Sequence, residues 1–328
     1  MRRRKFITVL GGATAWPLAG SAQPADRLRR VGVLIAFPES HPISRVSVTA
    51  VTQTLEHLGW VEGKNIRLDY RFASGDAALF KRRAAELVGL SPDAILASTA
   101  PAVFALREQT RTIPIGFVVV PDPVGLGIVQ SLAHPGGNIT GFASYDAAII
   151  GKWLQLLKEI APNVARVAII FNPDTAFFNA SLNRQVEAAA QSIGITVTFA
   201  PVHDDAAIEE AMDEEARERG GGLVVLPDSF NVTHRDVIVA AAARNSLPLI
   251  SLDVFPRAGG LMSYWFGSVE LYRAAASYID RILNGVNPAD LPVQYPTKYS
   301  LIINLKTAKA LGLSVPLHVL QIADEVIE

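Results

Sequence analysis

The sequence of 328 residues contains no cysteine. The chain therefore cannot form a disulfide scaffold, a thiol nucleophile or a zinc–thiolate site. It also lacks the cysteine that carries the lipid of a bacterial lipoprotein, so we expect no lipid anchor. Long apolar runs are missing as well, because no segment after the N-terminal one reaches the roughly 20 apolar residues that a transmembrane helix needs.

The chain has no excess of basic residues. Lysine and arginine together number 30 against 31 aspartates and glutamates, a formal net charge of −1. Proteins that bind nucleic acid present a basic face to the phosphates, so no nucleic-acid partner is expected. The six histidines show no His-x-x-x-His spacing, and no Walker loop, nucleophile elbow or Gly-x-Gly-x-x-Gly occurs. We therefore expect no metal, no cofactor and no catalytic residue.

The N-terminus has the composition of an export signal. Residues 2–5 are basic, residues 6–18 are mostly apolar, and small residues lead up to Ala22. The apolar stretch is too short, and too interrupted by glycine and proline, to span a bilayer. We predict a signal peptide over residues 1–22, cleaved near Ala22, which directs the mature chain to the periplasm. The segment fits a Sec signal, and RRKFI at 3–7 also approximates a twin-arginine signal.

Past the signal, short β-rich apolar runs alternate with amphipathic helical segments. This alternation is typical of parallel α/β sheets. RVGVLIA at 30–36 begins a first unit, and RVAIIF at 166–171 begins a second unit with the same order. Two similar α/β units in one exported chain predict two lobes that face each other across a cleft. Phe171 and Phe199 lie inside strand patterns and are expected in the core.

Several stretches, spread over the whole mature chain, resemble the substrate-binding proteins of an ABC transporter group related to tryptophan-type amino-acid uptake. Their joint occurrence in this order is more specific than any one of them. They are LGWVEGKNI at 58–66, DPVGLG at 122–127, LAHPGGNITG at 132–141, GGLMSY at 259–264, PADLPV at 288–293, NLKTAKALGL at 304–313 and ADEVIE at 323–328.

The resemblance implies an α/β fold of the type I periplasmic binding protein kind: two Rossmann-like lobes with parallel sheets, joined by a three-crossover hinge. The crossings are expected near 142–147, 253–260 and 294–299. With these crossings, lobe 1 comprises residues 28–143 plus 257–293, and lobe 2 comprises residues 144–256 plus 294–328.

The resemblance also implies a function. Such proteins trap a small ligand when the lobes close, deliver it to an ABC permease in the inner membrane, and catalyse nothing. We expect a monomer that binds an amino acid or a related carboxylate, with an aromatic side chain as one option. Two alternatives remain open: a sensory binding protein that presents its closed form to a membrane receptor, and a periplasmic enzyme that uses an aspartate in the cleft.

Ligands of open parallel sheets bind beyond the carboxyl ends of the strands. This rule marks the segments 37–40, 98–100, 121–122, 172–174 and 228–231 and residue 253. Together with Tyr145, an aromatic residue that could line the cleft, they give the candidate ligand-binding residues Phe37, Ser98, Thr99, Ala100, Asp122, Tyr145, Asn172, Asp228, Phe230 and Asp253. Aromatic members of this set could stack on a ligand side chain, although each is by itself more often a packing residue. Asp122, which precedes a proline, is also typical of a turn or cap.

Ser98, Thr99 and Ala100 lead into a helix, with Pro101 at its expected first position. Free backbone N–H groups and two hydroxyls there would suit a carboxylate, because the helix dipole favours negative charge at its N-terminus. The plainer interpretation is that Thr99 caps its own helix.

Asp228 and Asp253 both follow apolar strands of the second unit. An ionised carboxylate at such a place is costly unless it is solvated or paired, and either one could accept hydrogen bonds from an ammonium group. A helix cap or an interlobe salt bridge would explain each of them equally well. The sequence does not choose between the two aspartates.

Overall fold

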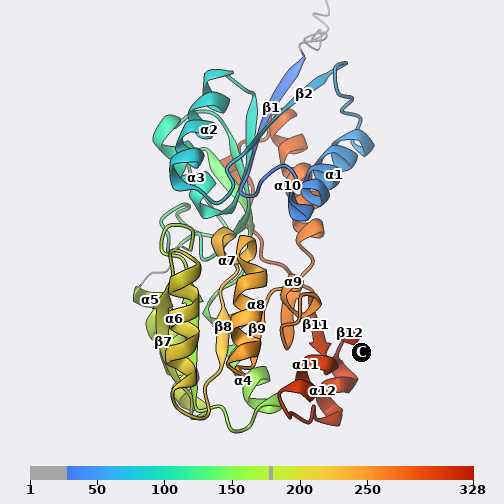
Figure 1. Cartoon of the computed structure of the whole chain (residues 1–328). Coiled ribbons are helices and arrows are strands. Elements are labelled where there is room, and N and C mark those ends of the chain that lie inside the picture. The colour runs from blue at the N-terminus through green and yellow to red at the C-terminus, as the bar shows by residue number, and fades with distance from the viewer. Residues whose placement is uncertain (1–27, 177–179) are drawn as a thin grey trace, which may run out of the picture.

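The structure is a computed structural model that describes residues 28–176 and 180–328. The predicted signal peptide at 1–22 lies outside the described residues. The chain folds into two α/β lobes stacked end to end, as Figure 1 shows. The expected fold class of two lobes with parallel sheets is confirmed.

Lobe 1 is built on a five-stranded parallel sheet in the order β2-β1-β3-β4-β5. Helices α1 and α10 pack against each other on one face, and α2 and α3 cover the other (Figure 1). The strands are β1 Arg29–Ile35, β2 Ile66–Phe72, β3 Ala94–Ser98, β4 Ile115–Val120 and β5 Ile139–Ala143, and the helices are α1 Pro42–His57, α2 Ala77–Gly89, α3 Thr99–Gln109, α10 Ser268–Leu283 and the short 3-10 helix η1 Pro288–Asp290.

Lobe 2 is built on a seven-stranded sheet in the order β12-β11-β10-β9-β8-β6-β7, in which only the β10–β11 pair is antiparallel. Helices α6 and α8 pack together on one face, and α4 and α5 on the other. The strands are β6 Arg166–Phe171, β7 Thr196–Pro201, β8 Leu223–Val225, β9 Leu249–Ser251, β10 Met262–Phe266, β11 Tyr299–Asn304 and β12 Glu325–Ile327. The helices are α4 Ala147–Ile160, α5 Ala180–Ser192, α6 Asp205–Ala216, α7 Ser229–Thr233, α8 Arg235–Arg244, α9 Val254–Arg257, α11 Leu305–Ala310 and α12 Leu317–Ile322.

The second crossing between the lobes comes later in the chain than the sequence predicts. Strand β10 pairs with β9 on one side and β11 on the other, so residues up to Phe266 belong to the sheet of lobe 2. The chain crosses at Gly267, directly before α10, and not at 253–260. The crossing implied by the resemblance was wrong here because β9 and β10 are joined by a short connection within one sheet.

The other two crossings run side by side. The first leaves β5 after Ala143, and the third precedes β11. The backbone N–H of Ala143 donates to the carbonyl of Gln294 over 2.8 Å, and Phe142 forms an isolated parallel bridge with Gln294. These contacts tie the two segments together at the joint between the lobes.

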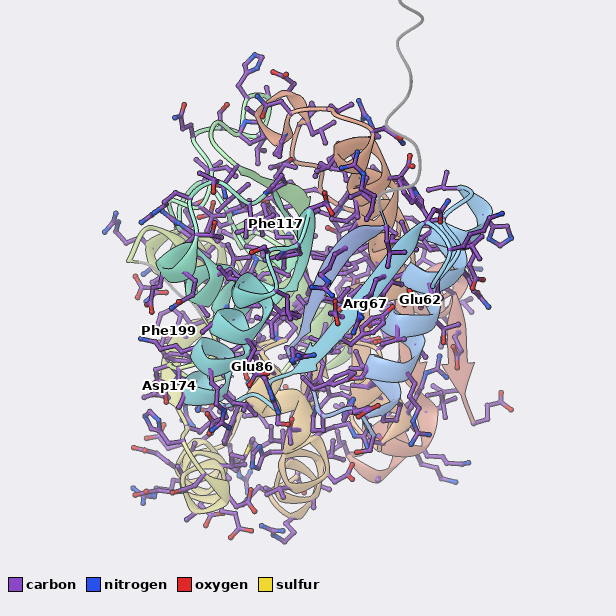
Figure 2. The ribbon with its side chains drawn as sticks, turned by 90° about the horizontal axis from the view of Figure 1, so that it is seen from above. Glu62, Arg67, Glu86, Phe117, Asp174 and Phe199 are labelled. Carbon is purple, nitrogen blue, oxygen red and sulfur yellow. The ribbon has the colours of Figure 1, made fainter. Side chains whose placement is uncertain are left out.

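Each lobe has its own apolar core. Phe117 in lobe 1 and Trp153 in lobe 2 are fully buried. Phe199, which is labelled with Phe117 in Figure 2, is only half-buried because β7 is an edge strand with one open side. Phe171 is also half-buried, at the end of β6. The prediction that both phenylalanines lie fully inside the core was therefore too strong.

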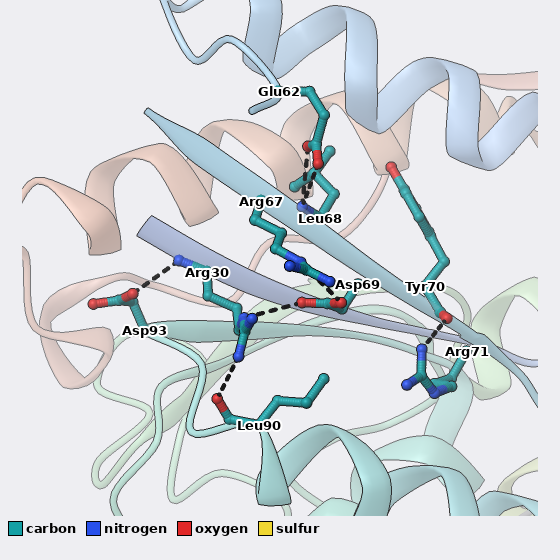
Figure 3. Close-up of polar contacts among 9 residues, drawn as sticks. All are labelled: Arg30, Glu62, Arg67, Leu68, Asp69, Tyr70, Arg71, Leu90 and Asp93. Atoms are coloured by element: carbon teal, nitrogen blue, oxygen red, sulfur yellow. Dashed lines mark hydrogen bonds and ion pairs between the residues drawn. The ribbon is translucent and has the colours of Figure 1, made fainter. Parts of the chain in front are cut away.

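A charged network fixes the end of lobe 1 that is remote from lobe 2. Arg30, near the start of β1, pairs with Asp69 of β2 over 3.2 Å and donates to the carbonyl of Leu90 over 3.1 Å. Asp69 also pairs with Arg67 over 3.4 Å, and the backbone N–H of Arg30 donates to Asp93 over 2.9 Å (Figure 3). The opposite ends of the strands, where the ligand rule places a site, are left to face lobe 2.

Candidate functional site

A small cavity of about 20 Å³ lies between the two lobes. It is far smaller than the roughly 300 Å³ or more of a typical small-molecule site. Residues that follow β3, β4 and β5 form one wall, and residues that follow β6 and β8 form the other. The lining residues are Thr99, Ala100, Val119, Pro121, Tyr145, Thr175, Ala176, Pro227, Asp228 and Ser229.

Wider hollows exist on the surface, but they lack the chemistry of this cavity. One of them, of about 470 Å³, runs along the crossings beside Phe142, Phe266 and Tyr295. Its one carboxylate, on Glu270, is exposed to solvent and paired with Arg273. The interlobe cavity, in contrast, contains a buried carboxylate.

Asp228 is that carboxylate, and only 4 % of its surface is exposed. One carboxylate oxygen accepts from the backbone N–H of Asn231 over 2.8 Å and from the hydroxyl of Thr175 over 3.1 Å. The other accepts from the backbone N–H of Asn172 over 3.1 Å and from the side chain of Asn231 over 2.9 Å. Four neutral donors therefore fix its orientation at the start of α7.

The electrostatics of Asp228 leave its charge uncompensated. Burial raises the pKa of this carboxyl to about 7, and the hydrogen bonds from Asn231, Asn172 and Thr175 offset only part of the effect. Within the described residues, no lysine, arginine or histidine forms an ion pair with it. A cationic group brought into the cavity would relieve this desolvation cost.

Tyr145 comes from the first crossing and closes one side of the cavity. Its side chain is buried, and its ring lies 5.9 Å from the ring of Trp265 at the end of β10. Burial raises the pKa of the Tyr145 hydroxyl, and the negative charge of Asp228 raises it further. The tyrosine is therefore a neutral, amphipathic wall next to the carboxylate.

Thr99 faces Asp228 from the other lobe, at the first residue of α3. Its backbone is left-handed, with φ of 74°, and its buried hydroxyl has no hydrogen-bond partner within the described part of the chain. Ser98 occupies the N-cap position and makes no side-chain cap bond, so neither residue caps the helix. Pro101 is the third helical residue, not the first as expected. The first two residues of α3, Thr99 and Ala100, thus line the cavity, and the Thr99 hydroxyl has no described partner.

Comparison with known proteins identifies the family of this chain. The sequence profile of the ABC transporter substrate binding proteins matches residues 31–327 of this chain. The chain belongs to the ABC transporter substrate-binding protein family. Members of this family are binding proteins rather than enzymes, and they are extracellular or periplasmic.

Relatives of this substrate-binding protein include a tyrosine-binding protein of Clostridioides difficile, which is 27% identical over 293 residues, 88% of this chain and 83% of the relative. A conserved domain protein from Vibrio cholerae has a TM-score of 0.84 at 30% identity, covering 92% of this chain and all of that one. Both comparisons extend over most of this chain.

Two further solved structures share the fold at 24% identity, and each covers 92% of this chain. An ABC domain from Streptococcus pneumoniae in complex with L-Trp has a TM-score of 0.83 and is matched over its full length. The ligand-free, open structure of an adhesive substrate-binding protein from Clostridium difficile has a TM-score of 0.67 and is matched over 99%. Both structures therefore share the two-lobed fold with this chain.

Four of the predicted ligand residues come together at the cavity of the substrate-binding protein: Thr99, Ala100, Tyr145 and Asp228. That they contact a ligand stays a prediction. The remaining six do not line the cavity, and each has another partner.

In lobe 1, Ser98 is turned away from the cavity. Its hydroxyl shares a 2.6 Å hydrogen bond with the hydroxyl of Tyr272 on α10. Phe37 stacks on His41, with ring centroids 5.0 Å apart. Asp122 accepts from the backbone N–H of Gly125 over 2.9 Å, as a turn residue does.

In lobe 2, Asn172 supports Asp228 from behind through its backbone N–H and does not face the cavity. Phe230 stacks on His234 at 3.9 Å between ring centroids. Asp253 precedes α9, where burial raises its pKa and the nearby Arg257 partly offsets that rise. Of the two aspartates between which the sequence does not choose, Asp228 lines the cavity and Asp253 does not.

The strand-end segments 121–122 and 228–231 include the cavity residues Pro121 and Ser229, but sequence reasoning missed four others, which are Val119, Thr175, Ala176 and Pro227. Thr175 and Pro227 directly adjoin the segments 172–174 and 228–231, so the strand-end rule applied over a few more residues would have found them. Val119 had no such signal, because it is counted inside β4.

Within residues 28–176 and 180–328, no helix is long and apolar enough to cross a membrane. The same residues hold no group of three or more His, Asp or Glu side chains arranged to bind a metal ion.

Proposed function

We propose that this substrate-binding protein traps a free amino acid between its lobes and delivers it to an ABC permease in the inner membrane. The observation that carries the proposal is Asp228, a buried carboxylate at the cavity whose charge no described residue balances. An α-ammonium group supplies the missing positive charge and the N–H donors that a buried carboxylate accepts.

The opposite wall suits the other end of an amino acid. The free hydroxyl of Thr99 and the N-terminus of α3, where Ala100 lies, can hold the α-carboxylate without a formal positive charge. Ammonium on lobe 2 and carboxylate on lobe 1 make the ligand a bridge. A bridging ligand stabilises the closed form because it interacts with both lobes only when they are together.

The relatives support an amino acid over other cargo. One is a tyrosine-binding protein, and one solved structure holds L-Trp. Tyr145 gives the side chain of such a ligand an aromatic neighbour. Because the family consists of binding proteins, we propose a carrier and not an enzyme, working as a monomer in the periplasm after removal of residues 1–22.

The test compares two aspartates of the same lobe. The mature chain, residues 23–328, is screened against the twenty amino acids by thermal shift, and the hit is titrated calorimetrically. Asp228→Asn should weaken binding at least 100-fold, since an ammonium buried without its charge partner loses about 3 kcal/mol or more. Asp253→Asn, which alters a carboxylate outside the cavity, should bind within about threefold of the parent. The proposal fails if no amino acid binds the parent, or if Asp228→Asn binds as tightly.

A further inference from the structure

Val119 lines the cavity from a backbone conformation that disfavours its side chain. Its φ of 60° lies in the left-handed region, where a β-branched residue is strained and glycine is relaxed. Among the described non-glycine residues with positive φ, only Thr99 and Val119 are β-branched, and both line the interlobe cavity. Strain of this kind persists where the surrounding structure imposes it, often at ligand sites.

The cause of the conformation is a bulge in β4. Val118 pairs with Phe142 and Val120 pairs with Ala143, which leaves Val119 as an extra residue in the ladder. Val118 and Val120 are fully buried, whereas Val119 is only partly buried. The core of lobe 1 is therefore filled by the neighbours of Val119, and the bulge brings Val119 itself to the cavity wall.

The cavity wall contains both polar and apolar groups, and we assign them different parts of the ligand. Asp228 and the hydroxyl of Thr99 are suited to the ammonium and carboxylate, which all amino acids share. The apolar remainder of the wall is left for the side chain, which differs among them; it consists of Ala100, Val119, Pro121, Ala176, Pro227 and the ring of Tyr145. Selection between amino acids must then come from this apolar wall.

We propose that Val119 is a specificity-determining residue, whose isopropyl group limits the size of the ligand side chain that the closed cavity accepts. This inference rests on the proposed function. The strained backbone is retained because glycine, which would fit it without strain, would leave the wall open at this point.

The experiment measures side-chain preference and stability together. Val119→Gly, Val119→Ala and Val119→Thr are compared with the parent for binding of L-alanine, L-leucine, L-phenylalanine, L-tyrosine and L-tryptophan. In Val119→Gly, the Kd ratio between the smallest and the largest ligands should shift at least tenfold in favour of the largest. Val119→Ala should shift it in the same direction by less. Val119→Thr keeps the branched shape and should retain the parent order.

Stability separates this role from a structural one. The unliganded Tm of Val119→Gly should equal or exceed that of the parent, because glycine relaxes the left-handed backbone. Val118→Ala is the matched control: it truncates the fully buried neighbour, and it should lower Tm while leaving the Kd ratio unchanged.

Two results would overturn the inference. If the parent binds an amino acid and both Val119→Gly and Val119→Ala keep the parent ratio, Val119 does not determine specificity, and only this inference fails. If the parent binds none of the amino acids, the proposed function fails and takes this inference with it.

Discussion

At the scale of single residues, the site depends on how Asp228 is held. Its carboxylate is buried at the start of α7 and receives four hydrogen bonds, yet its pKa is raised to about 7 because desolvation outweighs them. Such a group is stable in either protonation state near neutral pH. Binding of a cation must select the ionised state.

This selection predicts a pH dependence of affinity. A bound ammonium favours the carboxylate, so ligand binding lowers the pKa of Asp228 below its unliganded value of about 7. Binding below pH 7 therefore releases a proton, and the affinity should fall as the pH falls, by up to about tenfold per unit. Calorimetric titrations between pH 5 and pH 8 measure this slope.

The control for the pH profile is Asp253→Asn. The pKa of Asp253 is also raised by burial, but this residue does not line the cavity. The variant should keep the slope of the parent. A flat profile in the parent, or a slope that disappears in Asp253→Asn, would assign the titration to another group.

At the scale of secondary-structure elements, the start of α3 serves two purposes through adjacent side chains. Ser98 hydrogen-bonds Tyr272 and so joins the end of β3 to α10, inside lobe 1. Thr99 turns its hydroxyl to the cavity through a left-handed backbone. One residue therefore contributes to the lobe, and the next faces lobe 2.

Alanine variants should separate these two purposes. Ser98→Ala removes a buried hydrogen bond and should lower the free energy of unfolding by about 1–2 kcal/mol, without a change in ligand affinity. Thr99→Ala should weaken binding about tenfold or more and leave Tm within about 1 °C. Chemical denaturation and calorimetry measure the two effects. Thr99→Ser, which keeps the hydroxyl, should bind like the parent, and a reversed pattern in the alanine variants would refute this division.

At the scale of the whole molecule, three crossings hold two lobes that touch across a small cavity. The first and third crossings are hydrogen-bonded to each other, and Tyr145 of the first contacts Trp265 just before the second. At equal sequence identity, the fold resembles a complex with L-Trp more than an open, ligand-free structure.

Ligand-driven closure can be observed in solution. The radius of gyration from small-angle X-ray scattering should decrease when the amino acid found in the screen is added, because the ligand bridges the lobes. Asp228→Asn should show no decrease at the same concentration. A parent whose radius does not respond, although it binds the ligand, would show that binding and closure are not linked.

The sequence by itself determined the architecture, because its signals are local. The alternation of apolar runs and amphipathic segments predicted two α/β units, and the restart at 166–171 marked the second. The strand-end rule then led to Thr99, Ala100 and Asp228, since the carboxyl ends of parallel strands face the same way. The motifs from 58 to 328 indicated the family that the profile match confirms.

Only the tertiary structure decided what depends on contacts between distant residues. The pairing of β10 with β9 and β11 moved the second crossing to Gly267. Ser98 hydrogen-bonds Tyr272, from a helix far along the chain, and does not line the cavity. The bulge in β4, opposite β5, places Val119 at the cavity wall. Strand pairing, side-chain direction and burial are set by what packs against a residue, and periodicity along the chain does not contain that information.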